Sequence, residues 1–130
     1  MNRTIAAAAA LLLLAAGCGG SDDEGSALKV TGTVTASGAP ASQTVRLDMT
    51  DSLTFLPNVV NAKVGSLAVT VENAGAVPHN LVFDDTALGK TGTVKGHATA
   101  TLTVPLAKAG TFVFTCTFHS GMDGQVVVTG

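Results

Sequence analysis

Four side chains of this 130-residue chain form a set that could bind a transition metal. Cys116, His119 and Met122 follow one another at intervals of three residues, and His79 precedes them in Pro78-His79-Asn80. A thiolate and a thioether favour Cu(I), whereas imidazole serves both Cu(I) and Cu(II). A trigonal His₂Cys set with a weak axial Met is the pattern of blue-copper sites, so these residue types predict one copper ion that cycles between Cu(I) and Cu(II).

Other chemistries fit the same residues less well. Structural zinc sites rarely use a thioether. A nucleophilic role for Cys116 would need a base and a third, orienting group, and only His119 lies near it in the sequence. A second, catalytic copper would need a further histidine cluster, but His97 sits alone in a polar stretch typical of a solvated loop. We therefore expect a metal-binding protein that is not an enzyme.

The residues around the candidate ligands alternate as they do in β-strands. Cys116 continues a row formed by Phe112 and Phe114, because residues two apart share one face of a strand. His79 shares a face with Leu81 in the same way. If the two strands are neighbours, both ligands enter one apolar interior. The loop after Cys116 can then close the site from the end of the strand.

The period of two extends over most of the chain and predicts an all-β fold. Met49 falls on an apolar strand face and is expected in the core. About eight short strands separated by turns are typical of a Greek-key β-sandwich or barrel. The strand regions that we expect are 28–34, 44–50, 59–64, 67–72, 79–83, 99–104, 110–116 and 125–129, with turns at 38–42 and 65–66, an extended corner at 55–58 and a long polar loop over 84–96.

The N-terminal residues have the pattern of a targeting segment. Residues 1–17 are expected to be a signal peptide, because Arg3 is followed by an apolar run over 5–16 that is too short to span a bilayer. Residues 18–26 then form a polar linker without an apolar side chain beyond the cysteine, which cannot join a core. Residues 27–130 are left as one domain.

The end of the signal peptide resembles a bacterial lipoprotein signal. It reads Leu14-Ala15-Ala16-Gly17-Cys18, although leucine is usual where Ala15 stands. The resemblance implies that Cys18 is acylated and anchors the chain to a membrane, outside the cytoplasmic membrane or in the periplasm. The alternative is a plain secretory signal that is cut near Ala16 or Gly17.

Composition narrows the possible partners. Charged residues make up 12% of the chain and the formal net charge is −2, so a nucleic-acid-binding role has no support. The chain has two cysteines, and export permits disulfides. A Cys18–Cys116 disulfide is nevertheless not our expectation, because lipidation and metal binding explain the two residues separately.

Two segments resemble the cupredoxins, the blue-copper proteins that include the plastocyanins and amicyanins. Residues 73–84, Asn-Ala-Gly-Ala-Val-Pro-His-Asn-Leu-Val-Phe-Asp, are similar to the segment around the first copper histidine of plastocyanins. Residues 116–122, Cys-Thr-Phe-His-Ser-Gly-Met, resemble the ligand loop of cupredoxins in the short form of amicyanins. Plastocyanins have a longer gap between their second histidine and their methionine.

This resemblance implies a role for each candidate ligand. His79, Cys116 and His119 would be the equatorial ligands and Met122 the long axial one. The exposed edge of the second histidine is the usual exit for an electron, so His119 is expected at the surface among apolar residues. The aromatic docking residue of plastocyanins has no counterpart, since the chain contains no tyrosine.

The resemblance also implies two supporting residues. Asn80 would donate its backbone N–H toward the sulfur of Cys116, and its side chain would bind Thr117. Such bonds around the ligands fix their geometry and tune the potential of the metal.

The sequence thus favours a monomeric carrier of single electrons between redox partner proteins. The alternative is a module for copper trafficking or storage outside the cytoplasm. Such modules tend to use exposed Met-rich or paired-Cys sites, whereas this chain has only Met49 and Met122 besides its first residue.

Overall fold

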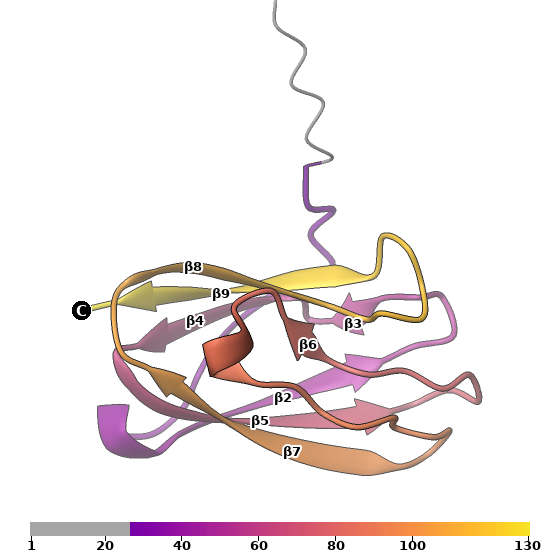
Figure 1. Ribbon diagram of the computed structural model, residues 1–130, viewed down its shortest axis with the longest axis horizontal. Coiled ribbons are helices and arrows are strands. Elements are labelled where there is room, and N and C mark those ends of the chain that lie inside the picture. The colour runs from indigo at the N-terminus through magenta and orange to yellow at the C-terminus, as the bar shows by residue number, and fades with distance from the viewer. Residues whose placement is uncertain (1–26) are drawn as a thin grey trace, which may run out of the picture.

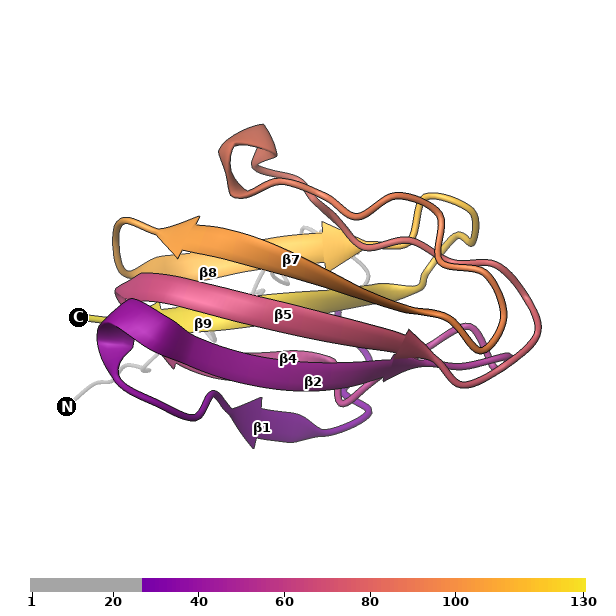
Figure 2. The same cartoon turned by 90° about the horizontal axis from the view of Figure 1, so that it is seen from below.

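Nine strands form two sheets that pack face to face in the computed structural model, which describes residues 27–130 (Figures 1 and 2). One sheet has the order β1 (Thr33–Thr35), β4 (Val59–Lys63), β9 (Asp123–Thr129), β8 (Gly110–Thr115), β6 (Val82–Phe83). The other has the order β3 (Phe55–Leu56), β2 (Gln43–Met49), β5 (Gly65–Asn73), β7 (Thr99–Leu106). Two short 3₁₀ turns, η1 (Pro40–Ser42) and η2 (Thr86–Leu88), lie in connections. The predicted all-β sandwich is confirmed, while the predicted signal peptide and linker lie outside the described residues.

Both sheets mix parallel and antiparallel pairs. β2 pairs with β5 in parallel, and β4 pairs in parallel with β1 and β9. The pairs β5–β7, β8–β9 and β6–β8 are antiparallel. Within residues 27–130 no helix is long and apolar enough to cross a membrane.

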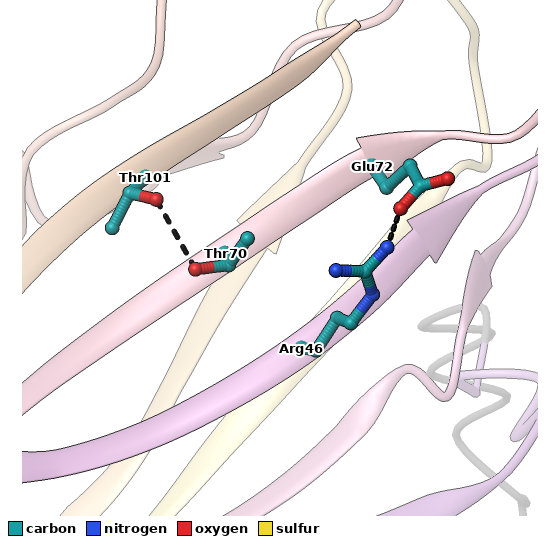
Figure 3. Close-up of polar contacts among 4 residues, drawn as sticks. All are labelled: Arg46, Thr70, Glu72 and Thr101. Carbon is teal, nitrogen blue, oxygen red and sulfur yellow. Dashed lines mark hydrogen bonds and ion pairs between the residues drawn. The ribbon is translucent and has the colours of Figure 1, made fainter. Parts of the chain in front are cut away.

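Alternation along the strands builds the core. In β2 and β5 every second side chain points inward and is buried, including Leu47, Val71 and the predicted core residue Met49. The opposite face of this sheet is polar, because Arg46 forms an ion pair with Glu72 and the hydroxyls of Thr70 and Thr101 lie 3.1 Å apart (Figure 3). Exposed pairs of this kind contribute at most about 1 kcal/mol each, so inward burial is the main source of stability.

Three phenylalanines from different strands pack together at the centre of the sandwich. The ring of Phe114 meets the rings of Phe55 and Phe83 edge to face, at centroid distances of 5.0 and 5.6 Å. Gly124 on β9 lies against Phe114, and a Cβ there would collide with the ring. Phe114 lies two residues before Cys116, so the cluster supports the end of β8, which Cys116 directly follows.

Two expected boundaries differ from the structure. Gly65 and Ser66, which were predicted as a turn, begin β5 and pair with Leu106 and Pro105. The chain changes sheets between β4 and β5, and Gly65 makes the bend at a φ of 144°. The first expected strand region, 28–34, is reduced to the three residues of β1.

The segment 79–83 is also less regular than predicted. Only Val82 and Phe83 form strand β6, whereas His79 makes an isolated antiparallel bridge with Val94. The supposedly polar loop over 84–96 folds back on this segment and buries Leu88 and Val94. The predicted alternation survives, because the backbone stays extended there and His79 is fully buried.

The aromatic cluster gives a test of the fold. Phe114→Ala is expected to lower the free energy of unfolding by about 3–5 kcal/mol, because it leaves a cavity between the two sheets. Phe118→Ala is the matched control: Phe118 is 48% exposed, and its loss should change stability by no more than about 0.5 kcal/mol. Denaturant unfolding of the metal-free proteins measures both. Equal losses would contradict this account of the core.

Candidate metal centre

Three of the four predicted ligands meet at one end of the sandwich. The candidate donor atoms of His79, Cys116 and His119 all lie within 4.8 Å of one another. Nδ1 of His79 is 3.8 Å from the sulfur of Cys116. His79 lies in the β5–β6 connection, and Cys116 and His119 lie in the loop between β8 and β9. These two connections lie side by side in both views (Figures 1 and 2).

The β8–β9 loop folds back so that the backbone of Met122 lies beside Cys116. The backbone N–H of Cys116 donates to the carbonyl of Met122 at 2.9 Å, and the N–H of Met122 donates to the carbonyl of His119 at 3.3 Å. Gly121 turns the chain with a φ of 82°, a conformation that side chains disfavour. Met122 is fully buried and Cys116 is 3% exposed. Backbone hydrogen bonds therefore fix the positions of Cys116, His119 and Met122 relative to one another.

His119 lies at the boundary between this site and solvent. Its ring is half-buried, and its Nε2 is 3.2 Å from the carbonyl of Pro78. A neutral imidazole that donates through Nε2 keeps Nδ1 as its acceptor, which is then available to a metal. Val77, Pro78, Thr93 and Phe118 line the surface around the ring. His119 therefore lies at the surface among mostly apolar residues, as the sequence predicted.

Burial controls the protonation of His79. Burial lowers the pKa of His79, and the neighbouring His119 ring lowers it further. The carbonyl of Thr50 and the carboxylate of Asp51 oppose this shift. The Thr50 carbonyl nevertheless makes no hydrogen bond with the ring, since Nε2 of His79 is buried without a partner. The lowered pKa favours the neutral form of His79, which is the form that binds metals.

The spacing of the donors fits a bound ion. A metal binds nitrogen and thiolate sulfur at roughly 2.0–2.3 Å, so two such donors in a trigonal plane lie about 3.7 Å apart. The separation of 3.8 Å between His79 and Cys116 is close to this value. Soft sulfur together with imidazole nitrogen suits copper in either oxidation state.

Asn80 and Thr117 join the two segments that carry the ligands. The Asn80 side chain donates from Nδ2 to Oγ1 of Thr117 and accepts at Oδ1 from the Thr117 backbone N–H, both at 2.8 Å. The predicted contact between these side chains is therefore present. Each residue directly follows a candidate ligand, so the pair limits how far His79 and Cys116 can move apart. The bond expected from the Asn80 backbone to the Cys116 sulfur stays a prediction.

Sequence reasoning missed the residues that hold the loop before His79. Asn73, fully buried, donates to the carbonyls of Val77 (2.7 Å) and Val94 (3.0 Å) and accepts from the N–H of Gly75 (3.0 Å). An amide on the inward face of a strand that otherwise carries Leu67, Val69 and Val71 is a signal that could have identified it. The second residue that holds this loop is Asp51, in the turn after β2. No pattern in the sequence predicts this contact.

Asn58 supports the opposite side of the site. It is 2% exposed, and its side-chain nitrogen donates to the carbonyls of Lys29 (2.8 Å) and Asp123 (3.1 Å). Its side-chain oxygen accepts from the N–H of Thr31 at 2.8 Å. Asp123 directly follows Met122, so the first residues of the domain brace the end of the ligand loop.

Comparison with known proteins agrees with the fold and the site. Residues 5–128 match the family described as the cupredoxin-like domain, and the chain belongs to this family. It is 32% identical over 119 residues to the chloroplastic plastocyanin of Fritillaria agrestis, covering 80% of this chain and 70% of the relative. It is 29% identical over 118 residues to the copper-resistant cuproprotein CopI of Rubrivivax gelatinosus, covering 69% of this chain and 68% of the relative.

Solved structures show the same similarity. A reduced Cu(I) form of a mutant amicyanin superposes with a TM-score of 0.55 at 30% identity, over 65% of this chain and 81% of that one. Dithionite-reduced auracyanin of Roseiflexus castenholzii gives 0.60 at 20% identity, over 72% and 100% of the two chains, and shares the fold. Copper is thus the cofactor on which the family and the donor set agree.

The environment of Asp51 makes the stability of the domain depend on pH. Hydrogen bonds from the backbone of Val77 and Ala76 lower the pKa of Asp51. Such a carboxyl stabilises the fold above its unfolded pKa of about 3.9 and loses this contribution as the pH falls through the lower, folded value.

The metal-free wild-type protein should therefore lose more stability than Asp51→Asn when the pH falls from about 5 to about 3. Denaturant unfolding at each pH measures the difference. Both proteins contain His79, so the difference between them reports the Asp51 carboxylate together with its effect on that histidine. Identical acid sensitivity would show that this carboxylate does not stabilise the fold.

Proposed function

We propose that this protein is a type 1 copper protein that carries single electrons between redox partner proteins, and that it is not an enzyme. The observation that supports this most is the contrast within the donor set. His79 and Cys116 are buried side by side, while His119 reaches the surface among apolar residues. A site of this kind shields its sulfur from solvent and still has one ligand at which a partner can dock.

His79, Cys116 and His119 would hold the copper, with Met122 as the weak axial donor. Bound copper would supply a one-electron Cu(I)/Cu(II) couple. The residues around the site limit the movement of the ligands, because the Asn80–Thr117 pair joins the segments of His79 and Cys116. Electron transfer benefits from such rigidity, since little has to rearrange when the charge changes.

The burial of the sulfur has a second consequence. Cys116 is 3% exposed and belongs to the same buried apolar cluster as Phe114. A thiolate is open to oxidation when it is accessible and charged, so burial among apolar residues would protect Cys116 from oxidation. The ring edge of His119, with Phe118 and Pro78 beside it, is the path by which an electron would leave or enter.

A copper-trafficking or storage role is the second candidate. The 29% identity to a copper-resistant cuproprotein favours it. The two roles differ in redox behaviour. A fast, reversible couple with little structural change supports electron transfer, whereas tight Cu(I) binding without cycling supports trafficking. Cyclic voltammetry of the copper-loaded protein separates them.

The export and anchoring of the chain belong to the same proposal. Residues 1–17 would be removed as a signal peptide, Cys18 would be acylated, and residues 18–26 would tether the cupredoxin domain of residues 27–130 as a monomer outside the cytoplasmic membrane. More than one acyl chain on a residue gives stable anchoring. Mass spectrometry of the mature protein should show an acylated Cys18 at the N-terminus. An unmodified start at another residue would refute the anchor.

The copper site predicts a colour. After copper loading and oxidation the protein should be intensely blue, and Cys116→Ser should abolish the colour because the thiolate is lost. Thr115→Ser is the control, since Thr115 precedes the ligand and points to the other face of β8. Visible absorption spectra measure both. A colourless wild-type protein would refute the type 1 site.

A matched pair of variants tests the axial donor in the same spectra. Met122→Leu should keep the blue colour and raise the reduction potential, because the remaining ligands stabilise Cu(II) less. Met49 is also fully buried, but in the core of the sandwich, so Met49→Leu should leave the potential unchanged. Equal shifts in the two variants would argue against an axial role for Met122.

A further inference from the structure

We infer that Asp51 is a positioning residue for the copper site: its carboxylate, in the exposed turn after β2, holds the backbone that delivers His79. The inference rests on the proposed copper-binding function. The sequence offers no hint of it, because 28 positions separate the two residues (79 − 51).

The contacts of the carboxylate are specific. Oδ1 of Asp51 accepts from the N–H groups of Ala76 at 2.9 Å and Val77 at 3.1 Å, and Oδ2 lies 3.2 Å from the same Ala76 N–H. Gly75 lies against the carboxylate so closely that a Cβ there would collide with it. Hydrogen bonds from two successive N–H groups fix the direction of the backbone as well as its distance.

The turn that carries Asp51 is itself ordered. The hydroxyls of Thr50 and Thr54 lie 2.7 Å apart, and the N–H of Thr50 donates to the Thr54 carbonyl at 3.0 Å. The carbonyl of Met49, at the end of β2, accepts from the N–H of Ala74 at 2.9 Å. The turn after β2 thus holds the Asp51 carboxylate next to the loop that follows β5.

The segment held by Asp51 serves two of the ligands. Val77 is followed by Pro78, whose carbonyl contacts Nε2 of His119 at 3.2 Å. His79 comes next, with Nδ1 facing the sulfur of Cys116. A shift of the backbone at 76–77 would therefore move one ligand directly and release the ring of another. Asn73 braces the same loop from its buried side, and Asp51 is the brace on its outer side.

The charge of Asp51 adds an effect that a purely structural brace would not have. The site carries one more positive charge when it is oxidised than when it is reduced. A nearby carboxylate therefore favours the oxidised form and lowers the reduction potential, although solvent screens the effect. Hydrogen bonds from the backbone of Val77 and Ala76 lower the pKa of Asp51, consistent with a carboxylate that stays charged beside the site.

Three variants of the copper-loaded protein separate these effects. Asp51→Ala removes the hydrogen bonds and the charge. Asp51→Asn removes the charge but keeps a side-chain oxygen that can accept from the same N–H groups. Asp84→Asn is the control, because it makes the same charge change at an exposed position beyond β6. Each protein is assayed for copper release to an excess of chelator and for its reduction potential by voltammetry.

Loss of a residue that hydrogen-bonds a metal ligand costs about 10–100-fold in metal affinity or activity. Asp51 contacts the backbone before His79 and not the ligand itself, so we expect an effect at the lower end of this range. We expect Asp51→Ala to release copper about tenfold faster than the wild type, and Asp51→Asn to stay within about twofold of it. Both should have a raised potential, and Asp84→Asn should match the wild type in both measurements.

Release from Asp51→Ala at the wild-type rate would overturn the inference. So would a shift of the potential in Asp84→Asn equal to that in Asp51→Asn. If Asp51→Ala does not fold, the potentials of the two asparagine variants decide the matter. A wild-type protein without a reversible couple would refute electron transfer instead, and copper release would still test the positioning role.

Discussion

The close approach of two buried side chains, His79 and Cys116, is the constraint on which the rest of the structure depends. Two polar groups lie 3.8 Å apart in an apolar interior, where an unpaired polar group costs about 1–3 kcal/mol. Packing has to hold them there. The edge-to-face contacts of Phe114 and the close fit of Gly124 set the end of β8, so the sulfur has little freedom to avoid its neighbour.

The connections that complete the site are held by few backbone hydrogen bonds between strands. Polar side chains hold them instead at three places: Asn80 between the ligand segments, Asn73 and Asp51 on either side of the loop before His79, and Asn58 at the end of the ligand loop. Amide and carboxylate groups can satisfy several backbone groups at once, which irregular segments need. The metal centre is therefore a product of loops made rigid by hydrogen bonds.

The position of His119 links this rigidity to the outside of the protein. The ring touches the carbonyl of Pro78 on its inner side and is bordered by Phe118. An apolar surround lets a partner approach without removing water from charged groups, which are costly to desolvate. Charged residues are sparse in the whole chain, so association would depend on the fit of this surface more than on long-range attraction.

Local pattern was enough to predict most of the strands, the candidate ligands and the inward faces of Phe114, Cys116 and His79, because the period of two is a property of the backbone. The sequence alone did not predict the crossover at Gly65 or the folding of 84–96 over His79. It also did not reveal that Asp51 and Asn58 reach across to segments far away in the chain. These side chains bind backbone groups that become neighbours only when strands distant in the sequence pair, β2 with β5 for Asp51 and β4 with β9 for Asn58. Tertiary structure alone therefore decided these hydrogen bonds.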